Sequence, residues 1–292
     1  MKKLLVVADK VGMEQFAFQK AQELARLSAA KLHVVLGCYE SLAMFDRDET
    51  NRDAKEIKSR ILSGREKAWK DYLQCHPATV EVSYETVWSQ SIHEWVVEHC
   101  QKNHYDMIVK TGVRSENWFY TPSDWQLFRE APAPVYSVNI LERKTKKNVL
   151  VALDLDTHNE AKIALNRQLI EAAFRLSVQT DTCLHCCFAI HIPSVVKELD
   201  LVDVPARVHQ TEEKAKREYQ SLLDEYDVAP DCLHIKEGKP WNVINEYARK
   251  LKAQCVVVGS LGRSGIPGKL IGNTAEKVVH RSATDLLVLK PN

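Results

Sequence analysis

Three glycines that follow an apolar run have a spacing suited to phosphate binding. Gly259, Gly262 and Gly272 come at and after the end of CVVVG (255–259) and form the pattern G-x2-G-x9-G. Glycine permits positive φ and lets the backbone approach a ligand closely. A helix that begins after the last glycine would offer unpaired backbone N–H groups and a favourable dipole to a phosphate. The pattern therefore indicates a phosphate-binding loop.

Two common phosphate-binding loops do not fit these residues. A Walker loop has four residues between its first glycine and the Gly-Lys pair, followed by Ser or Thr. Here five residues separate Gly262 from Gly268, and Leu270 follows the lysine. The dinucleotide fingerprint G-x-G-x-x-G is also absent, because two residues separate Gly259 from Gly262. Any phosphate site here must belong to another kind of nucleotide-binding fold.

The elements that would position this loop occur twice along the chain. KKLLVVADK near the start returns as KNVLVALDLD at 147–156, and the runs reach Asp9 and Asp154. Apolar residues at helical spacing follow each run, and in the second half Thr157 and Glu160 predict a capping box. Further strand-like runs follow in matching pairs at 31–40 and 183–192, 80–88 and 231–238, 106–110 and 255–259, and 134–140 and 285–290.

This alternation predicts an α/β fold. Strands separated by helices of ten or more residues imply right-handed crossovers and a parallel sheet covered on both faces. We expect two tandem Rossmann-like domains, each a five-stranded parallel sheet flanked by helices. Their predicted ranges are 1–141 and 148–292, joined by the polar linker LERKTKK. Because ligands of open parallel sheets bind beyond the carboxyl ends of the strands, the glycine loop lies at an expected binding edge.

Charge and composition restrict the class of partner. The chain has 40 basic and 39 acidic residues, and residues 1–145 carry 20 of each sign. Nucleic acid is not expected, since neither half has the required basic surface. The apolar run after Lys3 is too short for an export signal, and no later run is long enough to span a membrane. We expect a cytoplasmic protein whose eight cysteines are free thiols.

The glycine spacing, followed by Asn273 and Thr274, resembles the nucleotide-binding motif of the universal stress protein family. The resemblance covers the whole chain, because both halves have that family's order of five strands. TPSDWQLFR (121–129) and LGRSGIPGKLIGNTAEKVV (261–279) make the chain most similar to the tandem, E-type members. The resemblance implies an adenine nucleotide alpha hydrolase-like fold for each domain. It also implies a role in the stress response, which we expect to be non-enzymatic.

By this resemblance the second domain would bind ATP or a related adenine nucleotide. Asp154 would face the ribose and Ala189 would offer backbone groups to the adenine. The residues implied around the ribose and phosphates are Gly259, Gly262, Arg263, Gly272, Asn273 and Thr274. Asn273 stands where the family usually has Ser or Thr, and it can either donate to a phosphate or simply cap the helix. Asp154 can equally be a solvated strand end.

The corresponding loop of the first half departs from this pattern. Lys110 takes the place of the first glycine, and no glycine follows Gly112 in the loop. Trp118, Phe119 and Tyr120 fill the stretch where small residues are needed, and Asp124 puts a carboxylate where a phosphate would lie. We therefore expect no similar phosphate site in the first domain.

No metal site and no catalytic group are expected. HEWVVEH (93–99) lacks the second histidine position of either zinc-protease helix, so His93 and His99 are predicted on the solvent side of a helix. In CLHCC, alternation along a strand would point Cys183 and Cys186 to opposite faces. No serine or cysteine nucleophile has a base at an instructive spacing.

Two other functions stay open at this stage. The aromatic stretch 117–128 and the apolar insert 192–205 could line a cavity for an apolar small molecule or metabolite near the domain junction. A weak ATP-hydrolysing enzyme is the other alternative. The final strands, 134–140 and 286–290, are expected to pair the two halves as an intramolecular pseudo-dimer, with further self-association left open.

Overall fold

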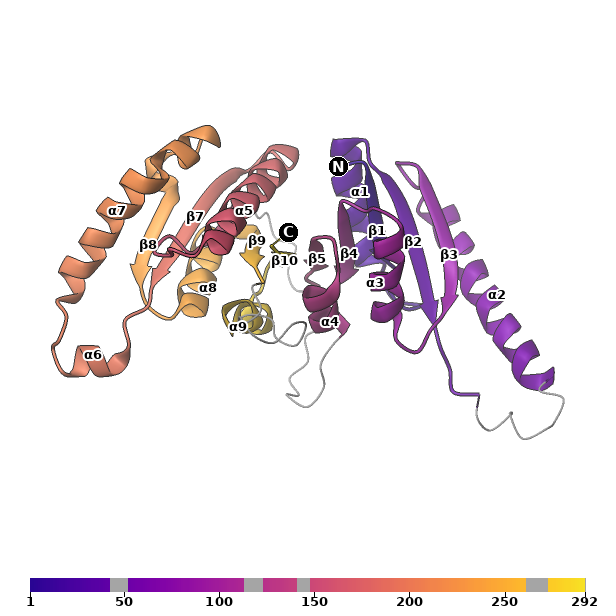
Figure 1. The fold of residues 1–292 in the computed structure, drawn as a ribbon. Coiled ribbons are helices and arrows are strands. Elements are labelled where there is room, and N and C mark those ends of the chain that lie inside the picture. The colour runs from indigo at the N-terminus through magenta and orange to yellow at the C-terminus, as the bar shows by residue number, and fades with distance from the viewer. Residues whose placement is uncertain (43–51, 113–122, 141–147, 261–272, 292) are drawn as a thin grey trace. The chain divides into compact units, whose positions relative to one another are not determined.

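The computed structural model describes residues 1–42, 52–112, 123–140, 148–260 and 273–291. These described residues divide into two compact units, one up to Val138 and the other from Asn139 onward. Figure 1 shows that in each unit helices pack along the strands.

The first unit alternates strands and helices from its first strand to its last. Its strands, in the spatial order β3-β2-β1-β4-β5, all pair in parallel. The elements in chain order are β1 (Lys3–Val7), α1 (Phe16–Ser28), β2 (Lys31–Cys38), α2 (Arg52–Cys75), β3 (Val82–Trp88), α3 (Ile92–Lys102), β4 (Met107–Thr111), α4 (Ser123–Glu130) and β5 (Val135–Val138).

The second unit repeats this order and adds a short helix after its second strand. Its strands follow the order β10-β9-β6-β7-β8, again with parallel pairing. The elements are β6 (Asn148–Leu153), α5 (Glu160–Gln179), β7 (Cys183–Ile190), α6 (Ser194–Glu198), α7 (Val204–Glu225), a 3-10 turn η2 (Pro230–Cys232), β8 (Leu233–Glu237), α8 (Pro240–Lys250), β9 (Ala253–Gly259), α9 (Asn273–Arg281) and β10 (Asp285–Leu289).

The central strands are buried on both faces, which explains their continuous apolar sequences. Leu4, Leu5 and Val6 in β1 have no exposed surface, and neither do Val149 and Leu150 in β6. The predicted α/β class, with a parallel sheet flanked by helices in each half, is confirmed. In each unit the first strand lies between the second and the fourth, so the strand order reverses beside it.

The start of α5 differs from the sequence prediction. Asn159, not Thr157, is the N-cap residue, and its side chain accepts a hydrogen bond from the Lys162 backbone N–H at 3.2 Å. The Thr157 hydroxyl instead accepts from the Asn159 backbone N–H at 3.3 Å, so the helix starts two residues later than a capping box at Thr157 requires. Among the described residues, no helix has the length and apolar character needed to cross a bilayer.

Candidate functional site

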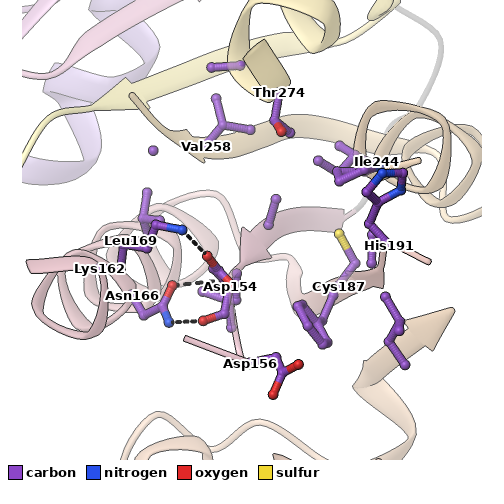
Figure 2. Close-up of a pocket in the computed structure, with 18 of the residues that line it drawn as sticks. Asp154, Asp156, Lys162, Asn166, Leu169, Cys187, His191, Ile244, Val258 and Thr274 are labelled. Carbon is purple, nitrogen blue, oxygen red and sulfur yellow. Dashed lines mark hydrogen bonds and ion pairs between the residues drawn. The ribbon is translucent and has the colours of Figure 1, made fainter. Parts of the chain in front are cut away.

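A pocket of about 510 Å3 opens at the carboxyl ends of β6, β7 and β9 in the second unit. It lies beside the point where the strand order reverses, which is where open parallel sheets bind their ligands. Figure 2 shows side chains from strands, loops and helices converging on this space. Four of the predicted site residues line it, namely Asp154, Ala189, Gly259 and Thr274.

Asp154 follows the last residue of β6, and its backbone is held by Asn166 of α5. The Asp154 N–H donates to the Asn166 side-chain oxygen at 3.1 Å, and the Asn166 side-chain nitrogen donates to the Asp154 carbonyl at 2.8 Å. Asn166 is buried, so this paired contact fixes the end of the strand from inside the protein. Figure 2 shows the two bonds side by side.

The Asp154 carboxylate forms an ion pair at the pocket. Lys162 of α5 approaches it to 2.7 Å, and both side chains are 44% exposed. At this exposure an ion pair contributes about 1 kcal/mol or less, so each partner can be exchanged for a ligand group at low cost. The arrangement places one hydrogen-bond acceptor and one cation at the same edge of the pocket.

A second group of charges stands nearby, on the loop after β6 and on α7. Asp156 forms ion pairs with Arg207 and Lys214, each at 3.1 Å. Asp156 and Arg207 line the pocket together with Lys162. No sequence pattern predicts a role for these residues, because only the packing of α5 and α7 brings them to the strand ends.

Ala189 contributes a small side chain to the wall of the pocket. It lies in β7, one residue beyond the last residue pair between β6 and β7, Leu153 with Phe188. The surrounding wall is apolar, with Ile190 of the same strand and Ile244 of α8. A wall of this kind suits the flat face of a base or another apolar ring.

Gly259 has a packing role in addition to any contact with a ligand. It does not use the positive φ that glycine permits. A Cβ atom at this position would instead lie 2.6 Å from Leu165 Cδ2 and 3.2 Å from Leu169 Cδ1. Both leucines belong to α5 and line the pocket, so the glycine lets α5 pack against the end of β9.

The start of α9 also borders the pocket. Asn273 is the first residue of this helix, and Thr274 and Ala275 line the space. The predicted site residues Gly262, Arg263 and Gly272 lie outside the described residues. The backbone of α9 therefore begins where the sequence analysis expects a phosphate to meet a helix N-terminus.

The equivalent strand end in the first unit carries a threonine. Thr111 is the last residue of β4, as Gly259 is of β9. Gly112 and Ser260 follow these residues. In each unit this backbone N–H donates to the carbonyl of the last residue of the neighbouring strand, at 2.8 Å for Gly112 and 2.7 Å for Ser260. The prediction that Lys110 replaces the first glycine is therefore wrong by one residue, because a match of apolar letters does not fix the register of a strand pair.

Two further positions can be matched between the units. Lys110 precedes Thr111 and so corresponds to Val258. Ala131 and Ser282 donate the backbone hydrogen bonds that end α4 and α9, so these two residues correspond. Asp124 and Ala275 lie at the same number of residues before them and therefore correspond as well. Lys110 and Asp124 are both buried and form an ion pair. The first unit therefore has a buried ion pair where the second has two apolar residues of its pocket wall.

Asp9, the counterpart of Asp154, is also held by its own unit. The Thr111 hydroxyl donates to its carboxylate at 2.9 Å, and the Ala17 N–H donates to the same oxygen at 3.2 Å. The buried Arg65 of α2 donates to the Asp9 backbone carbonyl. Burial raises the pKa of Asp9 above its ordinary value, and these hydrogen bonds only partly offset the effect.

The predicted solvent exposure of His93 and His99 is wrong. Their side chains are only 11% and 19% exposed. The His99 ring stacks on Trp95 at 4.4 Å between ring centres and lies beside His33 of β2. Helical periodicity distinguishes the two faces of α3, but it does not show how far neighbouring side chains cover the outer one.

The apolar insert proposed as a cavity wall exposes three of its seven large aliphatic side chains to solvent. Val195, Leu199 and Leu201 are 59%, 63% and 66% exposed. Ile192, at the start of the insert, does line the pocket. The aromatic stretch 117–128 lies partly outside the described residues.

Comparison with known proteins identifies relatives over the whole length of the chain. The model of the universal stress protein family matches residues 1–139 and 146–290. "Universal stress protein E homolog" of Haemophilus influenzae is 25% identical, with 100% of this chain and 98% of that protein covered. "Universal stress protein E" of Escherichia coli K12 is 27% identical, with coverages of 99% and 94%. A crystal structure of a functionally unknown protein from Pseudomonas aeruginosa PAO1 has 26% identity and a TM-score of 0.70, covering 99% of this chain and 92% of that one.

Proposed function

The chain belongs to the universal stress protein family of stress-response proteins, and we propose that its second unit binds ATP or a related adenine nucleotide without catalysing a reaction on it. The first unit, on this proposal, has no equivalent site. The protein would act in the stress response through the nucleotide-bound and nucleotide-free states of the second unit.

The observation that carries the proposal is the pocket at the carboxyl ends of β6, β7 and β9. Its volume of about 510 Å3 is within the usual range of small-molecule sites. Asp154, Gly259 and Thr274, which the family motif implies as ligand contacts, line this one space although they are far apart in sequence. The apolar wall around Ala189 suits the adenine, and the start of α9 suits the phosphates.

The charged side chains at the pocket can bind a nucleotide if their ion pairs are exchanged. Lys162 and Arg207, which now pair with Asp154 and Asp156, can bind a phosphate group instead. The released Asp154 carboxylate can then accept hydrogen bonds from ribose hydroxyl groups. The exchange replaces partly exposed, weak ion pairs by charge-assisted bonds to the nucleotide.

The described part of the pocket supports binding rather than covalent catalysis. Cys187 is its nucleophile by residue type, but it is buried, and burial raises the pKa of its thiol well above the ordinary value. The thiol is therefore protonated at neutral pH and is a poor nucleophile. His191, the one histidine on the described lining, is exposed at the pocket edge.

Isothermal titration calorimetry of the full chain with ATP tests the proposal. We expect one site per chain, and Asp154→Ala should weaken binding about 10- to 100-fold, because a hydrogen bond to a charged group contributes about 1.5–3 kcal/mol. Asp9→Ala, at the matching position of the first unit, is the control and should leave ATP affinity unchanged.

Three outcomes would contradict the proposal. Heat changes that are absent with ATP, ADP and AMP would exclude the nucleotide. Equal weakening by the Asp9 and Asp154 variants would exclude the assignment to the second unit. Steady release of phosphate by the wild-type protein that the Asp154 variant lacks would show an enzyme instead of a binding protein.

A further inference from the structure

A separate cluster of polar side chains lies in the first unit, remote from the carboxyl ends of its strands. His33 comes from β2, Glu85 from β3 and His99 from α3. One ligand atom from each lies within 4.8 Å of the other two. Tyr105, which precedes β4, contacts the Lys3 ammonium at the start of β1, so the cluster lies toward the amino ends of the strands.

Both imidazole rings are oriented by hydroxyl groups. His33 Nδ1 is 2.9 Å from the Ser83 hydroxyl, and His99 Nε2 is 2.9 Å from the Tyr105 hydroxyl. The other nitrogen of each ring faces the same carboxylate oxygen, Glu85 Oε1, at 2.7 Å from His33 Nε2 and 3.9 Å from His99 Nδ1. Metal-binding histidines are held in this way, with one nitrogen on the metal and the other on an outer hydrogen-bond partner.

The cluster is partly covered by the protein yet open to solvent on one side. His33 and His99 are only 16% and 19% exposed, whereas Glu85 is 40% exposed and leaves the cluster accessible from solvent.

We propose that His33 Nε2, His99 Nδ1 and Glu85 Oε1 form a binding site for a divalent transition metal ion such as Zn2+. Ligands about 2.0–2.2 Å from a tetrahedral zinc ion lie about 3.3–3.6 Å from one another. The separations of 2.7 Å and 3.9 Å from Glu85 fall on either side of this range, and the two histidine nitrogens lie within 4.8 Å of each other, so side-chain rotations can bring the three atoms into place. Two histidines and one glutamate leave the fourth position for water.

No sequence motif predicts this set of ligands, because its members come from three elements and follow no local spacing. A zinc-binding helix supplies two ligands from one turn, whereas α3 supplies His99 alone. The signal in the sequence was the pair of histidines at matching places in the two halves, His33 and His185.

The second unit shows what the same place looks like without a third metal ligand. His185 is the third residue of β7, as His33 is of β2. His234 replaces Glu85, and Tyr247 replaces His99 as the eighth residue of its helix. His185 Nδ1 and His234 Nε2 hydrogen-bond to each other at 3.0 Å, and Tyr247 stacks on His234. The described residues offer only two metal ligands there, so this cluster serves as a control for the three-ligand cluster of the first unit.

Zinc titration of the full chain by calorimetry, after removal of metals with a chelator and in the presence of a reductant, tests the proposal. We expect one zinc ion per chain at the cluster. Glu85→Gln keeps the shape of the side chain and should weaken this binding at least about 100-fold, beyond the usual effect of an outer partner. His99→Tyr, which reproduces the second unit, should do the same. His185→Asn is the matched control and should keep wild-type affinity.

Two further measurements separate the site from folding effects and from cysteine binding. Zinc should raise the melting temperature of the wild-type protein and of His185→Asn but not of Glu85→Gln, whose melting without metal should match the wild type. The cobalt complex should lack a thiolate charge-transfer band. Wild-type zinc affinity in both Glu85→Gln and His99→Tyr, or no stoichiometric binding, or a thiolate band in the single complex, would overturn the proposal.

Discussion

Asp9 and Asp154 follow the first strands of their units, yet they have different surroundings. Asp9 accepts hydrogen bonds from Thr111 and from the start of α1. Asp154 has its backbone fixed by Asn166, while its carboxylate meets only an exchangeable lysine at the pocket among the contacts described. One aspartate is part of the internal structure of its unit, whereas the other faces the pocket.

Three matched positions account for this difference. Thr111, Lys110 and Asp124 in the first unit stand where the second unit has Gly259, Val258 and Ala275. The first set consists of a hydrogen-bond donor and a buried ion pair, and the second of small or apolar residues that line the pocket. Two copies of one backbone fold can thus have different roles at the same strand ends, because a few side chains decide whether the space is filled or open.

The largest effect is expected from breaking the buried ion pair of the first unit. Lys110→Val alone gives β4 the residue that β9 has at the matching position, and it leaves the Asp124 carboxylate buried without its lysine. Loss of one partner of a buried pair costs about 3–5 kcal/mol of unfolding free energy. Urea unfolding of the full chain measures this loss.

The double variant Lys110→Val with Asp124→Ala copies both residues of the second unit and is the control. It should recover most of the stability, because no buried charge is left alone. A single variant as stable as the wild type would show that the pair is unimportant for the first unit, and the comparison would then rest on Thr111 alone.

A smaller effect is expected at the glycine of the second unit. Gly259→Ala places a methyl group against Leu165 and Leu169, and overpacking of this kind costs about 1–3 kcal/mol. The displaced leucines should also reduce the pocket and weaken ATP binding. The measurements are urea unfolding and calorimetry with ATP.

Thr111→Ala, at the matching position of the first unit, makes the comparison sharper. It should remove only the hydrogen bond to the Asp9 carboxylate, which costs about 1.5–3 kcal/mol of unfolding free energy, and should not change ATP affinity. If Gly259→Ala keeps both full stability and full ATP affinity, α5 must tolerate the methyl group, and the packing reason for this glycine is wrong.

The smallest effect concerns the pH dependence that Asp9 gives to the first unit. Its pKa in the folded protein is raised by burial, so the folded state holds this proton to a higher pH than the unfolded state does. Stability therefore falls as pH rises from the unfolded pKa, about 3.9, to the folded value. Asp9→Asn should remove this fall. As pH rises between these two values, the melting temperature of the variant should therefore increase relative to that of the wild type. Parallel melting curves against pH for the two proteins would contradict the argument.

The sequence predicts the two-fold repeat and the α/β class well, because both follow from patterns within single segments. The strands of both units are short apolar runs, as strands buried on both faces must be, and the intervening helices have periodic apolar residues. The placing of Asp154, Ala189, Gly259 and Thr274 at one pocket could also be anticipated, since parallel strands end at one edge of the sheet.

The remaining details depend on contacts between segments, which no local pattern contains. The match of Gly259 with Thr111 depends on strand register, and the cap of α5 at Asn159 depends on where the preceding loop turns. Lys162 and Asn166 lie 8 and 12 residues beyond Asp154, and only the packing of α5 brings them back to it. The burial of His99 likewise results from rings on other elements.

The burial of Cys187 has a consequence for chemistry under oxidising conditions. Peroxide reacts with the thiolate form of cysteine, and the protonated, buried thiol in the pocket offers very little of it. The exposed cysteines of the described chain are Cys75, at the end of α2, and Cys183, at the opposite end of β7 from the pocket. Oxidants would therefore modify these two first, and the pocket would keep its shape while the protein surface is being oxidised.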